Sequence, residues 1–583
     1  MKLLIADQGA ALYPVWTAPD AAVTTLHAAN ELVSFLSQMS GARFALLQGE
    51  TPPAQGILVG DSRYLAADDE LGKEGYVVRT VGRHICIAGG QPRGVLYGVY
   101  SFLETLGCRW FAADASHIPQ RSRLEAGPLD LRQVPALEYR ETWFNESEDA
   151  NWSVRNKHTG NFTRLDATRG GKIVMDPFVH SFDMIVPVDR HFDSHPEYFS
   201  MVDGQRIRER TQLCLTNPDV LRLTVEWVLD WIEKNPQVSV VSVSQNDWYN
   251  PCECPACKAL DDAEGSHAGS LIHFVNAVAE QVEQRYPDVV ISTLAYQYTR
   301  RAPKKLRPRH NVCVMLCSIE CCFAHPLREC NHIASFPQKT YGTTFQQDLQ
   351  AWAAVCDRLY IWNYAVNYSH YLMPYPNFHV FADNLRYFIE NNVKGVYEEG
   401  APSWHGGTEF AAMRAWVLVR LMWDPTQDTT RLVAEFINGY YKGAAVPVLR
   451  YHRLLQDTLA QNPDIHFGIY DPARPTYLTA EVMAEARKLM DEALVLADDD
   501  TIWKRVRTLW ASVRYWELYT LPVETPDRPK MLDDFFQELE NLGITMITEG
   551  HTLRQTRKLM DMGEVWRQRR QEGIEPPPPP WKL

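Results

Sequence analysis

The most informative segment of the chain reads Val238-Ser-Val-Val-Ser-Val-Ser-Gln-Asn-Asp-Trp-Tyr-Asn-Pro-Cys-Glu-Cys-Pro-Ala-Cys257. Its first half is a nearly unbroken β-branched run, typical of a strand buried on both faces of a parallel sheet. The run ends in Asn246, Asp247 and Trp248, followed by turn residues and three cysteines. An amide, a carboxylate and an aromatic at the C-terminal end of such a strand indicate an active-site element of a barrel enzyme. The alternative is a strand that ends in a polar turn, since Asn and Asp favour turns.

Strand and helix patterns alternate from about residue 135 to 405. The predicted strands are 137–144, 179–182, 238–244, 289–296, 312–316, 358–363 and 393–397, with a further one near 210–215. The helices predicted between them are 221–233, 270–286, 348–356 and 381–391. This alternation predicts an α/β protein built on a (β/α)8 TIM barrel.

The regions on either side of the barrel have other patterns. Before it, a hairpin at 76–80 and 84–88 and a helix at 93–104 ending near Gly107 predict a small α+β domain. After it, only helical patterns remain, at 409–423, 430–441, 446–461, 480–497, 501–520, 530–542 and 552–570, before the polyproline tail 576–580. The predicted domains are therefore 1–130, 131–424 and 425–583.

Composition and charge exclude several classes of protein. The net charge of −14 argues against a nucleic-acid or anionic-membrane partner. The first residues form too short an apolar run for a signal peptide, and no apolar run is long enough to span a membrane. We therefore expect a cytoplasmic protein whose 12 cysteines are mostly reduced. The sequence does not indicate an oligomeric state.

Acids, amides and aromatics dominate the predicted C-terminal strand ends. The residues expected to bind substrate there are Arg140, Trp143, His180, Trp248, Tyr296, Glu320, Trp362, Asn363, Tyr364 and Trp404. A Ser-His-Asp order, a phosphate loop and a dinucleotide fingerprint are all missing. The inventory favours cleavage of a glycosidic bond in an oligosaccharide or glycan, which needs carboxyl groups and aromatic walls but no cofactor. A single carboxylate at a strand end is more often a helix cap. The prediction therefore rests on the number of acids, amides and aromatics that gather at these strand ends.

Two assignments of the catalytic groups remain open. In the first, the substrate's own 2-acetamido group acts as the nucleophile. Asn246 orients this group, and Asp247 is a general acid/base with a raised pKa. In the second, the acid is Glu398 or Glu399, and Asp247 orients the substrate.

The spacing of Cys252, Cys254 and Cys257 suits a shared tetrahedral zinc ion that would hold the loop beside the site. A fourth ligand is missing locally. It would have to come from elsewhere in the chain, from a histidine or from Cys214, Cys317, Cys321, Cys322 or Cys330. The alternative is a set of free or disulfide-capable thiols.

Several segments resemble known families. The segment Arg93-Gly-Val-Leu-Tyr-Gly-Val-Tyr-Ser-Phe-Leu-Glu-Thr-Leu-Gly-Cys-Arg-Trp-Phe111 resembles the end of the N-terminal domain of family 67 α-glucuronidases and family 20 hexosaminidases. Four blocks are similar to the barrel of domain-of-unknown-function family 4838, namely 245–258, 318–326, 361–368 and 395–400. Part of that family is classified as glycoside hydrolase family 163, endo-β-N-acetylglucosaminidases that act on complex N-glycans.

This resemblance implies a retaining β-N-acetylglucosaminidase that uses the substrate's 2-acetamido group as nucleophile. Two alternatives remain. One is an α-glucuronidase-like exo-glycosidase for uronosyl sugars, in which Arg140 or His180 would bind a carboxylate. The other is a carbohydrate-binding protein without catalytic activity.

Overall fold

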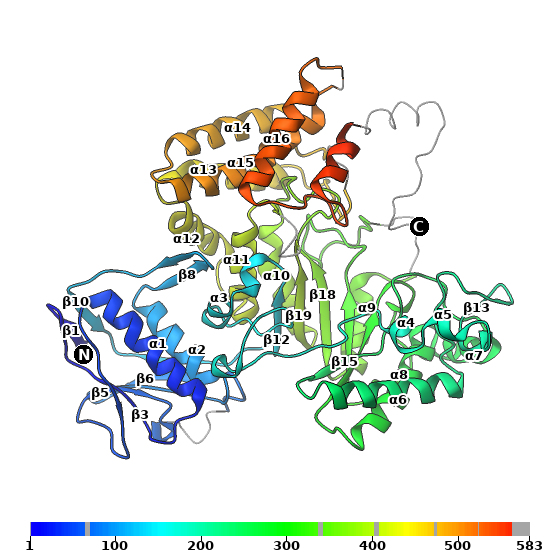
Figure 1. The fold of residues 1–583 in the computed structure, drawn as a ribbon, viewed down its shortest axis with the longest axis horizontal. Coiled ribbons are helices and arrows are strands. Elements are labelled where there is room, and N and C mark those ends of the chain that lie inside the picture. The colour runs from blue at the N-terminus through cyan, green and yellow to red at the C-terminus, as the bar shows by residue number, and fades with distance from the viewer. Residues whose placement is uncertain are drawn as a thin grey trace.

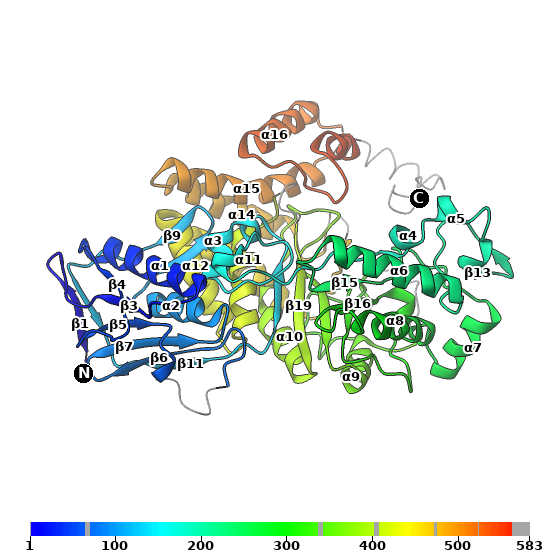
Figure 2. The same ribbon diagram turned by 60° about the horizontal axis from the view of Figure 1, so that its bottom comes forward.

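The computed structural model describes residues 2–64, 70–335, 342–401, 407–471, 475–522 and 524–561. Figure 1 shows a mixed α/β part near the N-terminus in blue, a central parallel sheet in green, and a stack of helices in yellow to orange. In the turned view of Figure 2, the blue part lies at one end of the molecule. Helix α7 (Pro255–Glu264) and strand β13 (Met201–Val202) lie at the other end.

The N-terminal part is built on a six-stranded mixed sheet in the order β11-β6-β7-β5-β3-β4. The helices α1 (Val23–Ser40) and α2 (Gly94–Thr105) pack on it and on each other. Gly98 lets α2 approach the sheet, because a Cβ there would lie 2.8 Å from the side chain of Ile87. The strands of this part are β1 (Leu3–Asp7), β2 (Ala10–Ala11), β3 (Val15–Thr17), β4 (Leu46–Gln48), β5 (Gly56–Val59), β6 (Tyr76–Val81), β7 (His84–Gly89), β10 (Arg123–Ala126) and β11 (Asp130–Gln133). The antiparallel pairing of β6 with β7 confirms the predicted hairpin.

The central sheet is parallel and curled, with six strands in the order β12-β19-β18-β17-β16-β15. They are β12 (Tyr139–Thr142), β15 (Val240–Ser242), β16 (Val290–Ala295), β17 (Val312–Cys317), β18 (Leu359–Tyr364) and β19 (Val393–Glu399). The helices between them are α6 (Pro218–Lys234), α8 (Ala268–Glu283), α9 (Phe345–Val355) and α10 (Phe378–Glu390). Six predicted strands and four predicted helices are thus confirmed. Nearly all residues of these strands are buried, because both faces of the sheet are covered.

Two predicted strands are wrong. In the segment 179–182, His180 has a left-handed backbone (φ 53°), and Phe182 begins the short helix α4 (Phe182–Ile185). The chain runs beside β15 a few residues earlier, where Met175 forms a parallel bridge with Val240. In the segment 210–215, Leu213 forms only an isolated antiparallel bridge with Phe199. Both segments are short and only partly apolar, and periodicity alone does not assign such segments to a strand.

Irregular segments span the arc between β12 and β15. The N–H of Thr159 donates to the carbonyl of Arg140 in β12 (3.2 Å), and the carbonyl of Thr159 accepts from Ile173 (3.2 Å). The carbonyl of Val174 then accepts from the N–H of Val240 in β15 (3.0 Å). Regular strands therefore form half a barrel, and hydrogen-bonded loops connect its edges.

Helices follow the central sheet in the C-terminal part. They are α11 (Ala411–Trp423), α12 (Thr429–Tyr441), α13 (Ala445–Ala460), α14 (Ala480–Val495), α15 (Asp500–Thr520) and α16 (Arg528–Leu542), in agreement with the predicted pattern. The loop after α16 packs on the loop that follows β18, where the N–H of Glu549 donates to the carbonyl of Tyr368 (2.9 Å). The predicted last helix is seen up to residue 561, and the polyproline tail lies outside the described residues.

Short elements connect these parts. They are β8 (Arg109–Ala112), β9 (Ala115–His117), α3 (Ala150–Arg155), α5 (Val188–His191) and β14 (Gln205–Arg206). Among the helices in the described ranges, not one combines the length and the apolar character that crossing a membrane requires.

Candidate active site

The two adjacent glutamates at the end of β19 point to opposite faces of the sheet, because side chains alternate along a strand. Glu399 accepts a hydrogen bond from the indole Nε1 of Trp362 on β18 (2.6 Å). Glu398 instead accepts from Nδ2 of Asn363 at 3.1 and 3.2 Å, and Asn363 accepts from the hydroxyl of Ser318 (2.7 Å). Glu398 and Asn363 are therefore on the face opposite to Glu399, Trp362 and the candidate site.

Glu399 shares its space with two other carboxyl groups. The negative charges of Glu549 and Asp247 both act on it. Asp247 follows β15 and accepts a hydrogen bond from the hydroxyl of Tyr296, which follows β16 (3.1 Å). Glu399 is 9% exposed, whereas Asp247 is exposed. The structure thus brings a buried acid, at the end of β19, and an exposed acid, after β15, to the C-terminal edge of the same parallel sheet.

The environment of Glu399 favours its protonated form. Burial raises its pKa well above the usual range, and the charges of Glu549 and Asp247 raise it further. The hydrogen bond from Trp362 opposes this shift, but burial is the larger effect. Burial also raises the pKa of Glu549, against a lowering hydrogen bond from Tyr470. A carboxyl group that keeps its proton near neutral pH can donate it to a leaving group.

Sequence reasoning missed Glu549 and Tyr470. The hydroxyl of Tyr470 donates to Oε2 of Glu549 (3.1 Å). Both residues lie in loops of the C-terminal helical part, far in sequence from any strand end. No motif marks them, so only the docking of these loops on the sheet could reveal them.

Aromatic rings line the space around Glu399. Trp362 and Tyr397 lie edge to face with 4.7 Å between ring centroids, and Phe178 contacts both at 5.4 Å. Tyr364 packs edge to face on Tyr368 (6.0 Å). The hydroxyl of Tyr368 holds the backbone carbonyl of Glu399 at 2.8 Å. Aromatic faces of this kind suit the apolar faces of a sugar ring.

His180 lies beside this group, with its ring centroid 6.0 Å from that of Tyr296. Its Nδ1 is 2.7 Å from the carbonyl of Gln245, so Nδ1 carries the proton and donates. In the neutral ring, Nε2 is then an acceptor.

Asn246 is committed to the backbone of two loops. It is buried, its Oδ1 accepts from the N–H of Asp183 (3.0 Å), and its Nδ2 donates to the carbonyl of Thr211 (3.1 Å). Trp248 donates its indole N–H to the same carbonyl (2.7 Å) and is 36% exposed. The geometry gives Asn246 the role of holding the loop that carries Asp247.

Among the predicted substrate-binding residues, Asn363 lies on the face opposite to the candidate site, as described above, and Arg140 and Glu320 form buried ion pairs. Arg140 is fully buried and pairs with Glu74 of the N-terminal part (2.9 Å), with its guanidinium over the ring of Trp423. Glu320 is buried and pairs with Arg300. The predictions for Arg140 and Glu320 were wrong because a buried ion pair between distant segments leaves no local pattern in the sequence.

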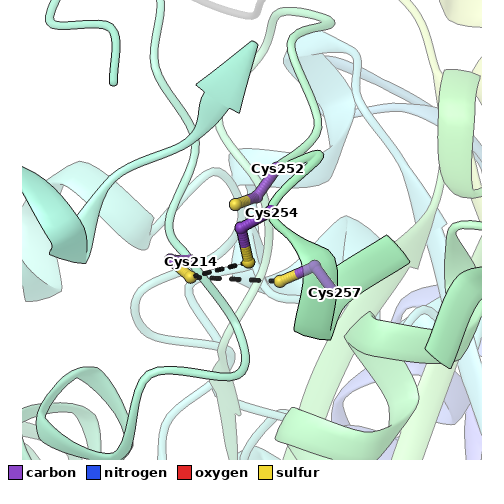
Figure 3. A group of neighbouring side chains, drawn as sticks. All are labelled: Cys214, Cys252, Cys254 and Cys257. Carbon is purple, nitrogen blue, oxygen red and sulfur yellow. Dashed lines mark hydrogen bonds between the residues drawn. The ribbon is translucent and has the colours of Figure 1, made fainter. Parts of the chain in front are cut away.

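The structure places the remaining predicted residues as follows. Trp143 stacks on Phe162 with 5.2 Å between centroids and lies against Tyr397, so it belongs to the aromatic packing. Trp404 lies outside the described residues. Cys252, Cys254 and Cys257 lie together with Cys214, as Figure 3 shows.

Comparison of the structure with solved structures finds a likeness of fold to several glycoside hydrolases. A family GH138 enzyme targeting pectin rhamnogalacturonan II is 9% identical, with a TM-score of 0.54 over 97% of this chain and 81% of that one. The structure named CpGH84D is 10% identical, with a TM-score of 0.48 over 97% of both chains. A chitobiase from Flavobacterium johnsoniae is 11% identical, with a TM-score of 0.44 over 96% and 97%.

The sequence itself matches two family models. The glycosyl hydrolase family 67 N-terminus matches residues 7–102, and domain of unknown function DUF4838 matches residues 110–453. The second match spans more than half of the chain, so the protein belongs to the DUF4838 family, as the resemblance implied. No curated protein sequence matches it.

Proposed function

We propose that this protein is a retaining β-N-acetylglucosaminidase that uses the 2-acetamido group of its substrate as nucleophile. The observation that carries the proposal is the pairing of a buried, proton-retaining Glu399 with the hydrogen-bonded Asp247–Tyr296 pair on one edge of the sheet. Of the two assignments that the sequence left open, this geometry favours Glu399 as the acid and Asp247 as the group that orients the substrate.

Each proposed step follows from these positions. Glu399 gives its proton to the glycosidic oxygen, and the acetamido carbonyl oxygen attacks C1 as the leaving group departs. Asp247 accepts the acetamido N–H, which makes the carbonyl oxygen a better nucleophile and stabilises the oxazolinium ion. The Glu399 carboxylate then takes a proton from a water molecule, which attacks C1 and opens the oxazoline ring. Two inversions at C1 give net retention.

The proposed architecture is a distorted (β/α)8 barrel. In such barrels the active site lies at the C-terminal ends of the strands, where Asp247, Tyr296, Trp362 and Glu399 are found. The irregular segments between β12 and β15 would occupy the places of the missing strands. With this barrel we retain the domain division at residues 130 and 424.

The structure argues against a uronosyl substrate. Arg140, the expected carboxylate-binding residue, is fully buried against Glu74. The charges of described residues that act on Glu399 are both negative, so a uronate would be repelled there. His180 alone remains for that alternative.

A substrate panel tests the proposal. The full chain is assayed on aryl β-N-acetylglucosaminides, aryl α-glucuronides and N-glycan oligosaccharides, with and without a thiazoline analogue of N-acetylglucosamine. Hydrolysis of acetamido sugars and inhibition by the thiazoline are expected. Hydrolysis of glucuronides alone would reject the proposal in favour of the uronosyl alternative, and binding without hydrolysis would reject enzymatic activity.

A further inference from the structure

Four buried cysteines meet beside the candidate site (Figure 3). The sulfurs of Cys214, Cys252, Cys254 and Cys257 all lie within 4.8 Å of one another. Cys214 is 3.6 Å from Cys254 and 4.0 Å from Cys257. Four thiolates bound to zinc at about 2.3 Å would be about 3.8 Å apart at the corners of a tetrahedron. The sequence indicated three ligands, and the fold supplies Cys214 as the fourth.

The surroundings of this cluster suit thiolates. The backbone N–H of Met201 and the guanidinium of Arg206 point at the sulfur of Cys252, at 3.4 and 3.5 Å. The hydroxyl of Thr216 is 3.3 Å from the sulfur of Cys257. Donors around metal-bound sulfur orient the ligands and offset their negative charge. A disulfide would need sulfurs about 2.05 Å apart, so the observed separations suit metal ligands better.

A second cluster of potential metal ligands lies elsewhere in the structure. The ligand atoms of Cys322, His325, Cys330 and His466 also lie within 4.8 Å of one another. The sulfur of Cys322 is 3.5 Å from Nδ1 of His325 and 3.4 Å from Nδ1 of His466. The sulfur of Cys330 is 3.6 Å from Nδ1 of His466. Zinc bonds of about 2.3 Å to sulfur and about 2.05 Å to nitrogen place such ligands about 3.5 Å apart.

We propose that the protein binds two structural zinc ions, one at Cys214, Cys252, Cys254 and Cys257 and one at Cys322, His325, Cys330 and His466. Tetrahedral sets of four sulfurs, or of two sulfurs and two nitrogens, select zinc among common metal ions, with iron–sulfur chemistry as the competitor. With four protein ligands each, both sites are closed and leave no position for a substrate.

Each ion holds a loop of the candidate site. The first joins the loop that follows Asp247 to the segment that carries Gln212, whose side chain bonds both the N–H and the carbonyl of Asn246 at 2.9 Å. The second joins the loop after β17 to the segment before Tyr470, where the N–H of Phe323 also donates to the carbonyl of Phe467 (2.9 Å). This positional role rests on the proposed function, but the metal binding does not.

Metal content tests the proposal without reference to activity. The full chain, produced with zinc and purified without chelator, is analysed for zinc and iron by mass spectrometry. About two zinc ions per chain are expected. Cys257→Ala and His466→Ala should each lower the content to about one, and the double variant to about zero. Cys86→Ala, a buried thiol of β7 outside both clusters, is the matched control and should retain two.

A second measurement covers variants that fail to fold. In the wild-type chain, a strong chelator should release the zinc and expose thiols of the two clusters to a thiol reagent, and added Co²⁺ should give the absorption of tetrahedral thiolate coordination. A wild-type chain that holds iron, or no metal after exposure to zinc, would overturn the proposal. Unchanged zinc content in Cys257→Ala or in His466→Ala would overturn the corresponding site.

Discussion

Trp362 donates its indole N–H to Oε2 of Glu399 across 2.6 Å, between neighbouring parallel strands. Of the two adjacent glutamates, Glu399 is the one that faces Asp247, and this hydrogen bond fixes the orientation of its side chain. It also stabilises the charged form of a carboxyl group that burial keeps protonated. This balance defines an acid that can give up its proton and take it back, as a retaining glycosidase requires.

The adjacent glutamates give a matched test of the acid. Glu399→Gln should lower kcat about 10²- to 10⁴-fold, because the amide cannot protonate the leaving oxygen. The loss should be larger for an oligosaccharide than for an aryl glycoside, whose leaving group needs less help. Glu398→Gln, on the opposite face, should keep kcat within about twofold. Steady-state kinetics with circular dichroism measures both, and the reverse ranking would move the acid to Glu398.

The pH profile should report the bond between Trp362 and Glu399. Because the indole N–H lowers the pKa of Glu399, Trp362→Phe should raise it. The protonated form then persists to higher pH, and the alkaline limb of the kcat/KM profile should shift upward. Asp247→Asn removes a negative charge that raises the same pKa, so it should shift this limb downward. Shifts in the same direction for both variants would contradict this electrostatic account.

The hydrogen bond between Tyr296 and Asp247 should act through Asp247. Tyr296→Phe should lower kcat/KM about 10- to 100-fold, the value of a hydrogen bond to a charged group. In an Asp247→Asn background, the same change should have a much smaller effect, because the partner is already lost. Additive losses in a double-mutant cycle would show that Tyr296 contacts the substrate independently.

The buried pair of Arg140 and Glu74 should matter for stability. Arg140→Ala should destabilise the protein by about 3–5 kcal/mol, because Glu74 then lacks one of its two buried cationic partners. Arg140→Met together with Glu74→Gln should recover part of this loss. Denaturant unfolding followed by fluorescence measures the stability of each variant, and the double variant should unfold at a higher denaturant concentration than Arg140→Ala. The KM of the folded variants should stay unchanged, and a large increase would restore Arg140 to the substrate site.

The sequence alone determined most of the elements of this protein and the types of residue at the strand ends. Hydrophobic patterns are local, so the runs that became β15 to β19 and the amphipathic helices between them could be read directly. The short segments 179–182 and 210–215 have no clear period and were wrongly predicted as strands, because tertiary contacts decide their conformation. The cluster Cys252, Cys254 and Cys257 was visible for the same local reason.

Only the tertiary structure decided which of these groups meet. Glu398 and Glu399 point to opposite faces because side chains alternate along a strand, but the packing of β19 decides that Glu399 is the one beside Trp362 and Asp247. Glu549, Tyr470, Cys214 and His466 join their clusters from distant segments, because folding brings together residues that no local pattern connects. The same physics removed Arg140 and Glu320 from the site, since a buried charge must find its partner wherever the fold supplies one.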